Sequence, residues 1–563
     1  MISSRQKKEI VAVFLASIIL SFFLFGNVIS GKFVGDDNAV VNSRTDLRSL
    51  KNIPDFFTSS AYPGQASVGL YRPLTLFSYA FNFTFSEKPA GFHILNILIH
   101  ALNVVLVFLI TCKFTSKKIA YFSSLLFLFL PIHTEAVSSI VGRSELLSVF
   151  FILLALLLFL KNRHIWASLV FLFALLSKEF AVILLPLIGL LLLFEAVETK
   201  KLKKFIRIGL FYLPPPAIYF FLRYLVLGKY AFGGIIFDHV TAPLAFLSLK
   251  ERIFSGFFSF FLYLRKSFYP VDLSPDYYFN QIPAVQNIFY SPQAIAGLIL
   301  FLGFVAMIVF GHKNLKVAAS ILLVPFIFIS NMFFLTSGSF AERWWYLPSF
   351  GLAVVVMIFI DWVIGKYKRL KPVFIIFSLF LTGWFSFVII KQNRIWFSNE
   401  SLFVYAAKVS SNSAFARSNL AAVYLGKKDF DKAKEEVEAA LRIYNAHMPA
   451  LNILGKLYWR DGRYEEAGAA FEKAIEADVR DSNSRGFYRT LAFLNLDLGN
   501  NREAFAYMKK AIEFPAAGGS EKIIKTDEIL YQVLEDFKDR KVGSYTQEEG
   551  EELSSLIKII RGF

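Results

Sequence analysis

Asp36 and Asp37 are adjacent carboxylates that follow the first hydrophobic stretch of the chain, residues 10–30. About 20 apolar residues cross a bilayer as a helix, so the pair is expected just beyond the membrane boundary. A carboxylate at that height can act as a general base and accept a proton from a hydroxyl group. The sequence leaves open which aspartate is the base and whether the pair binds a divalent metal, and it predicts no other cofactor.

Further charges occur in three segments predicted on the same side of the membrane: 131–146, 177–180 and 341–349. The cationic side chains in these segments could bind a phosphate leaving group. Arg343 is the first candidate, and Arg143 and Lys178 are weaker ones. The supporting acidic and imidazole groups are His133, Glu135, Glu145, Glu179 and Glu342, with Asp276 from the loop near 272–276. The alternative is that these charges cap helices or pair with each other, as Arg343 would with Glu342.

A polar stripe follows one face of the span predicted at 92–112. His93, Asn96, His100 and Asn103 are spaced three, four and three residues apart, so they share one helical face. Lipid would penalise these groups, and we expect them inside the bundle. The two histidines could bind a metal, but two turns separate them. Structural hydrogen bonding is the favoured interpretation.

The composition is that of a polytopic membrane protein. The 563 residues are 56% hydrophobic and include 65 Phe and a single cysteine, which excludes an internal disulfide. Residues 1–396 contain 36 Lys and Arg against 17 Asp and Glu. This basic excess fits cytoplasmic loops and does not indicate nucleic-acid binding.

We predict an all-α fold with about eleven membrane spans. They cover 10–30, 92–112, 119–132, 145–160, 164–178, 180–195, 205–226, 291–311, 316–336, 343–365 and 372–391. With the N-terminus in the cytoplasm, the lysine-rich loops all lie inside and the C-terminal half lies outside the cell membrane. The aromatic-rich segment 253–270 is then interfacial or re-entrant. If it crosses, the count is twelve.

The C-terminal part repeats with a period of 34 residues. Leu420, Tyr424, Ala433 and Ala440 recur as Leu454, Tyr458, Ala467 and Ala474. This period, with small residues where two helices meet, is typical of tetratricopeptide repeats. We predict a membrane domain over 1–396, about three repeats over 397–515 and capping helices over 516–563.

The first helices of these repeats are expected to line a groove that binds an acceptor protein. Repeat geometry places these residues there: Asn452, Lys456, Trp459, Arg460, Arg489 and Phe493. The alternative for Trp459 is packing against the membrane domain or the next repeat.

Several motifs together resemble a known family. "FVGDDNAVVNSRTDLRS", "PIHTEAVSSIVGRSELLS", "LLSKEFAVILLP" and "ERWWYLPSFG", followed by the repeats, are similar to the transmembrane and tetratricopeptide-repeat O-mannosyltransferases and their bacterial relatives. The resemblance implies a membrane glycosyltransferase of the GT-C class. It implies an inverting transfer from a polyprenyl-phosphate sugar to a protein or glycan hydroxyl at the non-cytoplasmic face. It also implies that Asp36 and Asp37 are the catalytic pair.

This sequence departs from the family pattern in two ways, and two other functions remain open. It has fewer repeats than the eukaryotic members, and it has Trp344 and Trp345 where relatives have smaller residues. The alternatives to a glycosyltransferase are a membrane-anchored repeat scaffold without catalysis and a transporter of lipid-linked sugars. A transporter would place its ionisable groups near the bilayer midplane, whereas these lie at one face.

Overall fold

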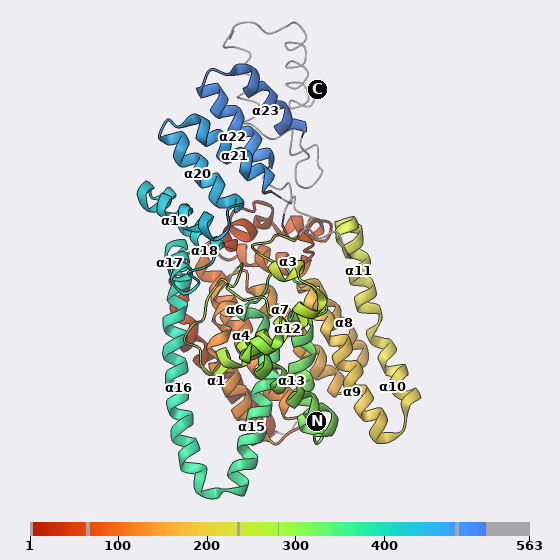
Figure 1. Cartoon of the computed structure of the whole chain (residues 1–563). Coiled ribbons are helices and arrows are strands. Elements are labelled where there is room, and N and C mark those ends of the chain that lie inside the picture. Colours follow the sequence, from red (N-terminus) through yellow and green to blue (C-terminus); the bar gives the residue numbers. More distant parts are fainter. Residues whose placement is uncertain (1–3, 63–67, 233–236, 280, 479–483, 514–563) are drawn as a thin grey trace. The chain divides into compact units, whose positions relative to one another are not determined.

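The structure is a computed structural model that describes residues 4–62, 68–232, 237–279, 281–478 and 484–513 (Figure 1). Contacts divide the chain into two units. The first contains Met1–Ala61, Leu70–Phe232 and Thr241–Ser411, and the second contains Tyr62–Gly69, Gly233–Val240 and Asn412–Phe563. The predicted capping helices over 516–563 lie outside the described residues.

The first unit is a bundle of apolar helices, and each of the eleven predicted spans forms at least one helix. The long ones are α1 (Ser4–Phe25), α4 (Pro89–Thr111), α5 (Lys117–Phe129), α7 (Arg143–Leu160), α8 (His164–Ser177), α9 (Leu184–Thr199), α11 (Pro214–Leu227), α13 (Pro292–Phe310), α14 (Lys313–Ile329), α15 (Pro348–Lys366) and α16 (Lys371–Asn393).

Among the described residues, eight helical segments are long and apolar enough to cross a membrane, and a ninth results if α5 and the bent Pro131–Ser138 segment form one span. The chain is therefore a multi-pass membrane protein. The other two predicted spans are α8, with 14 residues, and α14, with 17. Both are shorter than the roughly 20 residues that a perpendicular crossing needs, so the count of eleven stays a prediction.

The first unit also contains further helices. They are α2 (Ile53–Phe56), α3 (Pro73–Phe83), α6 (Thr134–Ser138), α10 (Leu202–Gly209) and α12 (Leu249–Phe268). A capping box fixes the start of α12, because the Ser248 side chain accepts from the Glu251 backbone and the Glu251 side chain accepts from the Ser248 backbone. This helix contains the segment predicted to be interfacial, and it does not qualify as a span.

The last two long helices of the first unit, α15 and α16, form a helical hairpin (Figure 1). Nearly all side chains from Lys368 to Phe380 are exposed, and most of them are apolar. Exposed apolar surface of this extent suits contact with lipid. The first unit continues through α17 (Asn399–Val409), so it ends after the boundary we predicted at 396.

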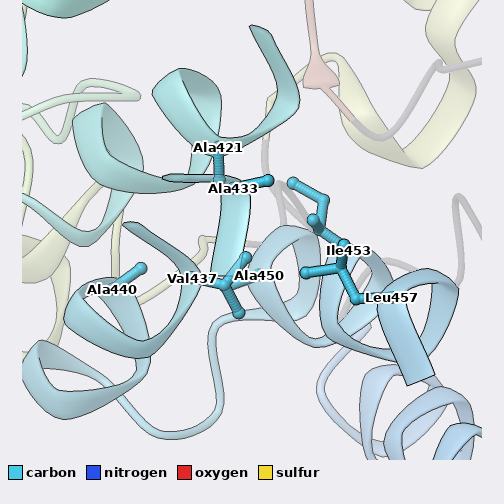
Figure 2. Close-up of a cluster of buried hydrophobic side chains, with 7 residues drawn as sticks. All are labelled: Ala421, Ala433, Val437, Ala440, Ala450, Ile453 and Leu457. Carbon is cyan, nitrogen blue, oxygen red and sulfur yellow. The ribbon is translucent and has the colours of Figure 1, made fainter. Parts of the chain in front are cut away.

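The second unit contains three helix pairs. They are α18 (Ala414–Gly426) with α19 (Phe430–Ile443), α20 (Met448–Arg460) with α21 (Tyr464–Glu476), and α22 (Ser484–Asp497) with α23 (Asn501–Glu513). Figure 2 shows the core between the first two pairs, where Ala421, Ala433, Ala440 and Ala450 surround Val437, Ile453 and Leu457. Small side chains let the helices approach closely, which explains the repeated alanines of the sequence.

Candidate active site

The two adjacent aspartates lie on a short helical turn after the first span. After α1, a turn at Gly26–Ser30 and an extended segment lead to Gly35, whose φ is 53°. This left-handed conformation suits glycine, which has no Cβ to clash. The Gly35 amide donates to the Asn399 side chain at 2.8 Å. Asp36 and Asp37 follow at the start of the helical turn that contains Asn38–Asn42.

Asp37 is fully buried and holds two loops together. One carboxylate oxygen accepts from the Val34 amide at 3.1 Å, and the other accepts from the Val141 amide at 2.9 Å. Burial raises the pKa of Asp37 to about 7, and these backbone bonds oppose that rise. These two bonds fix the carboxylate between the segment after α1 and the loop before α7.

Asp36 is exposed, in contrast to its neighbour. Protein surrounds the carboxyl group closely enough that lost hydration raises its pKa, and the positive charge of Arg343 partly offsets the rise. A carboxylate that is accessible and more basic than usual suits a general base. Of the two aspartates, Asp36 therefore has the properties of a base.

Arg343 lies near Asp36 and is held by Glu135. The Arg343 backbone amide donates to one Glu135 oxygen at 2.9 Å, and its guanidinium donates to the other. Only 4% of the Glu135 side chain is exposed, against 36% of the Arg343 side chain. The alternative pairing of Arg343 with Glu342 is wrong, because residues adjacent on a helical turn do not face each other.

Glu342 instead stabilises the loop before α13. Its carboxylate accepts from the Tyr277 hydroxyl and from the Ser274 amide at 2.8 Å. Burial raises the pKa of Glu342 to about 8, and nearby Lys266 lowers it. The same loop contains Asp276, which is buried and accepts from the Tyr278 amide at 2.9 Å.

Tyr278 is a residue that the sequence analysis missed. Burial raises the pKa of its hydroxyl, and Arg343, Asp36, Asp276 and Glu135 all influence that pKa electrostatically. The phenol therefore lies in the same cluster as the candidate base. The run of tyrosines at 277–278 was the only available signal in the sequence, and it does not separate this residue from Tyr277, which bonds Glu342.

Arg143 does not fit the phosphate-binding role that we predicted. The side chain is fully buried, and it donates to Asn96 at 2.8 Å, to Asn82 at 3.0 Å and to the Phe92 carbonyl at 2.7 Å. These neutral acceptors use its guanidinium inside the protein. Arg143 thus supports the loop before α7, where Gly142 lies so close to Ala136 that an added Cβ would be 2.3 Å from its carbonyl oxygen.

Lys178 is also engaged inside the protein. It is 7% exposed and forms an ion pair with the buried Glu145. Burial lowers the pKa of Lys178, and Glu145 opposes the fall. The adjacent Glu179 accepts from Arg72 at 2.9 and 2.5 Å. Arg72 was not among the predicted site residues. Its partner Glu179 is 107 positions away, so no local pattern in the sequence links the two.

The polar stripe of α4 lies inside the bundle. Asn96 donates to the Ser139 carbonyl at 2.9 Å, and Asn103 donates to the Leu146 carbonyl at 3.1 Å. His100 shares a hydrogen bond with the Tyr346 hydroxyl at 2.7 Å, and His133 shares one with Ser349 at 2.8 Å. His93 is fully buried beside Gly31. These contacts are structural.

The residues present do not form a metal site at the aspartate pair. Within the described ranges, no group of three or more His, Cys, Asp or Glu side chains is arranged to hold an ion. The divalent metal that the sequence left open is therefore not supported by this geometry.

Two of the predicted groove residues of the repeats, Trp459 and Arg460, contact other side chains of the repeat unit. The indole of Trp459 donates to Asp497 on α22 at 2.9 Å and packs edge-on to Phe471. Arg460 pairs with Asp461 and lies over the Phe430 ring. Lys456 is exposed, whereas Asn452, Arg489 and Phe493 are half-buried. Trp459 thus packs against the next repeat, as the alternative interpretation held.

Comparisons with known proteins identify the repeats and a group of relatives. A tetratricopeptide repeat family model matches residues 416–447 and 449–478. The protein O-mannosyl-transferase TMTC3 of Mus musculus is 27% identical over 78% of this chain and 52% of its own length. The protein O-mannosyl-transferase F38B6.6 of Caenorhabditis elegans is 28% identical over 75% of this chain and 61% of its own.

The human protein O-mannosyl-transferase TMTC1 is similar to the same degree, at 27% identity over 78% of this chain and 56% of its own length. A solved structure of ArnT from Cupriavidus metallidurans bound to undecaprenyl phosphate covers 86% of this chain and 80% of its own. Its TM-score of 0.41 and identity of 13% are too low to assign a fold.

The fold and the repeats define a multi-pass membrane protein with tetratricopeptide repeats. This chain is similar to the TMTC protein O-mannosyl-transferases, as the motifs of the sequence indicated. It spans roughly half to two thirds of the length of these curated relatives, 52% in one and 61% in the other.

We predict that Asp37→Asn destabilises the membrane unit while Asp36→Asn does not. An asparagine presents an N–H group to one of the two backbone amides that Asp37 accepts. A buried donor left without an acceptor costs about 1–3 kcal/mol. The exposed Asp36 substitution should stay within about 0.5 kcal/mol of wild type. Thermal unfolding of the purified proteins in one detergent measures both effects, and equal melting temperatures for the two variants would contradict the assignment.

Proposed function

We propose that this protein is a glycosyltransferase that moves a sugar from a polyprenyl-phosphate donor to a hydroxyl group. The relatives are named protein O-mannosyl-transferases, so we propose mannose as the sugar and Ser or Thr of a protein as the acceptor. The observation that carries the proposal is the exposed Asp36 close to the positive charge of Arg343. A base and a cation at one site are what the transfer requires.

The reaction proceeds as a single displacement. The Asp36 carboxylate takes the proton of the acceptor hydroxyl, whose oxygen forms a bond to C1 of the sugar. The bond between C1 and the phosphate oxygen breaks, and the phosphate departs with the electron pair. Attack from the face opposite the phosphate inverts the configuration at C1.

Arg343 stabilises the departing phosphate. Its guanidinium offers several N–H donors in a plane that fits phosphate oxygens. Glu135 uses only part of that donor set and fixes the side chain in place. Because Glu135 is buried and Arg343 is partly exposed, the donors that remain face the accessible side.

The membrane unit and the repeats divide the work. The polyprenyl chain stays in the lipid, and its phosphate reaches the boundary where the first span ends. The repeats bind the acceptor through the exposed parts of their groove, such as Lys456. Tetratricopeptide repeats form extended concave binding surfaces, and this favours a protein acceptor.

Asp36→Asn should lower the transfer rate by about 10²–10⁴ because it removes the general base. Membranes that contain the variant are incubated with radiolabelled polyprenyl-phosphate mannose, and label in protein is counted. The exposed Asp55 lies in the same outer loop, so Asp55→Asn is the matched control.

In wild type, the rate should fall as the pH drops through the raised pKa of Asp36. Wild-type turnover in Asp36→Asn would remove this residue from the mechanism.

Arg343→Gln should weaken the use of the donor, since it removes a charge-assisted contact worth about 1.5–3 kcal/mol. The rate measured against donor concentration should show a loss of roughly tenfold or more in kcat/KM. Arg369→Gln changes an exposed arginine in the hairpin between α15 and α16 and serves as the control. An unchanged response to donor concentration in Arg343→Gln would leave its role limited to the pair with Glu135.

The proposed sidedness requires the repeats outside and the N-terminus in the cytoplasm. In a Cys112→Ala background, Asn445→Cys should react with an impermeant thiol reagent in intact cells, and Lys201→Cys should not. Both positions are exposed. Charge distribution sets this orientation, because the loops rich in lysine stay inside. Protection of Asn445→Cys would mean an even number of spans before the repeats.

A further inference from the structure

An apolar groove lies among α1, α4 and α5, well away from the candidate active site. Its volume is about 320 Å³, and its lining includes Ala12, Ala16, Leu20, Val104, Tyr121 and Leu125. This size is at the lower end of the roughly 300–1,000 Å³ of ligand sites. The short side chains of Ala12 and Ala16 leave the space that longer residues would fill.

One end of the groove is basic. The start of α1, the end of α4 and the start of α5 meet there, and they contribute exposed lysines at positions 7, 8, 113, 117 and 118. Glu9 bonds Lys117 at 2.5 Å and the Tyr121 hydroxyl at 2.7 Å. Asp361 bonds Lys118 at 2.7 Å. The five lysines exceed these two carboxylates, so the end carries a positive excess.

The basic end and the candidate active site lie at opposite ends of α1. The groove contacts α1 between Ala12 and Leu20, and the lysines precede it. Asp36 follows the other end of this helix, which spans 22 residues. At about 1.5 Å per residue, the two ends are roughly 33 Å apart. The phosphate of a donor engaged at Asp36 therefore cannot also contact these lysines.

We propose that this groove binds an anionic glycerophospholipid, with one acyl chain against Ala12 and Ala16 and the phosphate at the lysines. The apolar lining fits the chain, and the positive excess selects a lipid with net negative charge over a zwitterionic one. Glu9 weakens the site, because it neutralises the lysine nearest to Tyr121. The site is separate from sugar transfer and does not depend on the proposed function.

The test is native mass spectrometry of the full-length protein with equal amounts of phosphatidylglycerol and phosphatidylcholine. Wild type should retain phosphatidylglycerol preferentially. Lys7→Gln with Lys8→Gln should reduce that preference by roughly 30-fold, since each lysine near an anionic headgroup contributes about fivefold. Ala16→Leu fills the groove and should abolish retention. Glu9→Gln should have the opposite effect and increase the preference.

Two matched controls separate the groove from general effects. Gly303→Leu adds the same bulk on α13, where an added side chain meets no atom within 4 Å. Lys200→Gln with Lys201→Gln removes two exposed lysines between α9 and α10. Both controls should behave as wild type.

Several outcomes would overturn the proposal. They are equal retention of the two lipids by wild type, retention unchanged in Ala16→Leu, and a preference that Glu9→Gln does not raise. Displacement of phosphatidylglycerol by polyprenyl phosphate would assign the groove to the donor instead. A dimer that Ala16→Leu dissociates would assign it to a second copy of the chain.

Discussion

The carboxylate of Asp37 is the contact on which the geometry of the candidate active site depends. It accepts from the backbone at Val34 and at Val141, so it joins the segment after the first span to the loop before α7. That loop also rests on Asn96, whose amide donates to Ser139 and whose oxygen accepts from Arg143. Buried backbone groups must be paired, and these side chains provide the partners. The backbone next to Asp36 is thereby fixed in position.

The cations near the candidate active site are compensated by neutral acceptors or by carboxylates. Arg143 donates to amide and carbonyl oxygens. Lys178 forms an ion pair with Glu145, and Arg343 forms one with Glu135. Burying one partner of such a pair without the other is costly. As a result, these buried cations have structural partners, whereas Asp36 is exposed and Arg343 is partly exposed.

The sequence predicted features that depend on local patterns. Apolar runs located a helix for each predicted span, whereas α2, α3 and α6 were not predicted. The 34-residue period located the helix pairs, with Ala433 and Ala467 in their cores. Partners distant in the chain could not be predicted, because packing decides them. Adjacency suggested Glu342 for Arg343, yet the partner is Glu135, 208 positions earlier. Asp36 is exposed and Asp37 is buried, and the sequence could not predict this difference because both residues are aspartates.

The cores of the repeat unit have a consequence for how such proteins diversify. Each cluster is built by neighbouring helix pairs alone, as Val437 with Ile453 and Phe471 with Leu491 show. Duplicating or deleting a pair changes only the interfaces next to it. The number of repeats can thus drift over evolution while the membrane unit keeps its geometry. Under the proposed function, the range of acceptors can then widen or narrow between lineages with no mutation near Asp36.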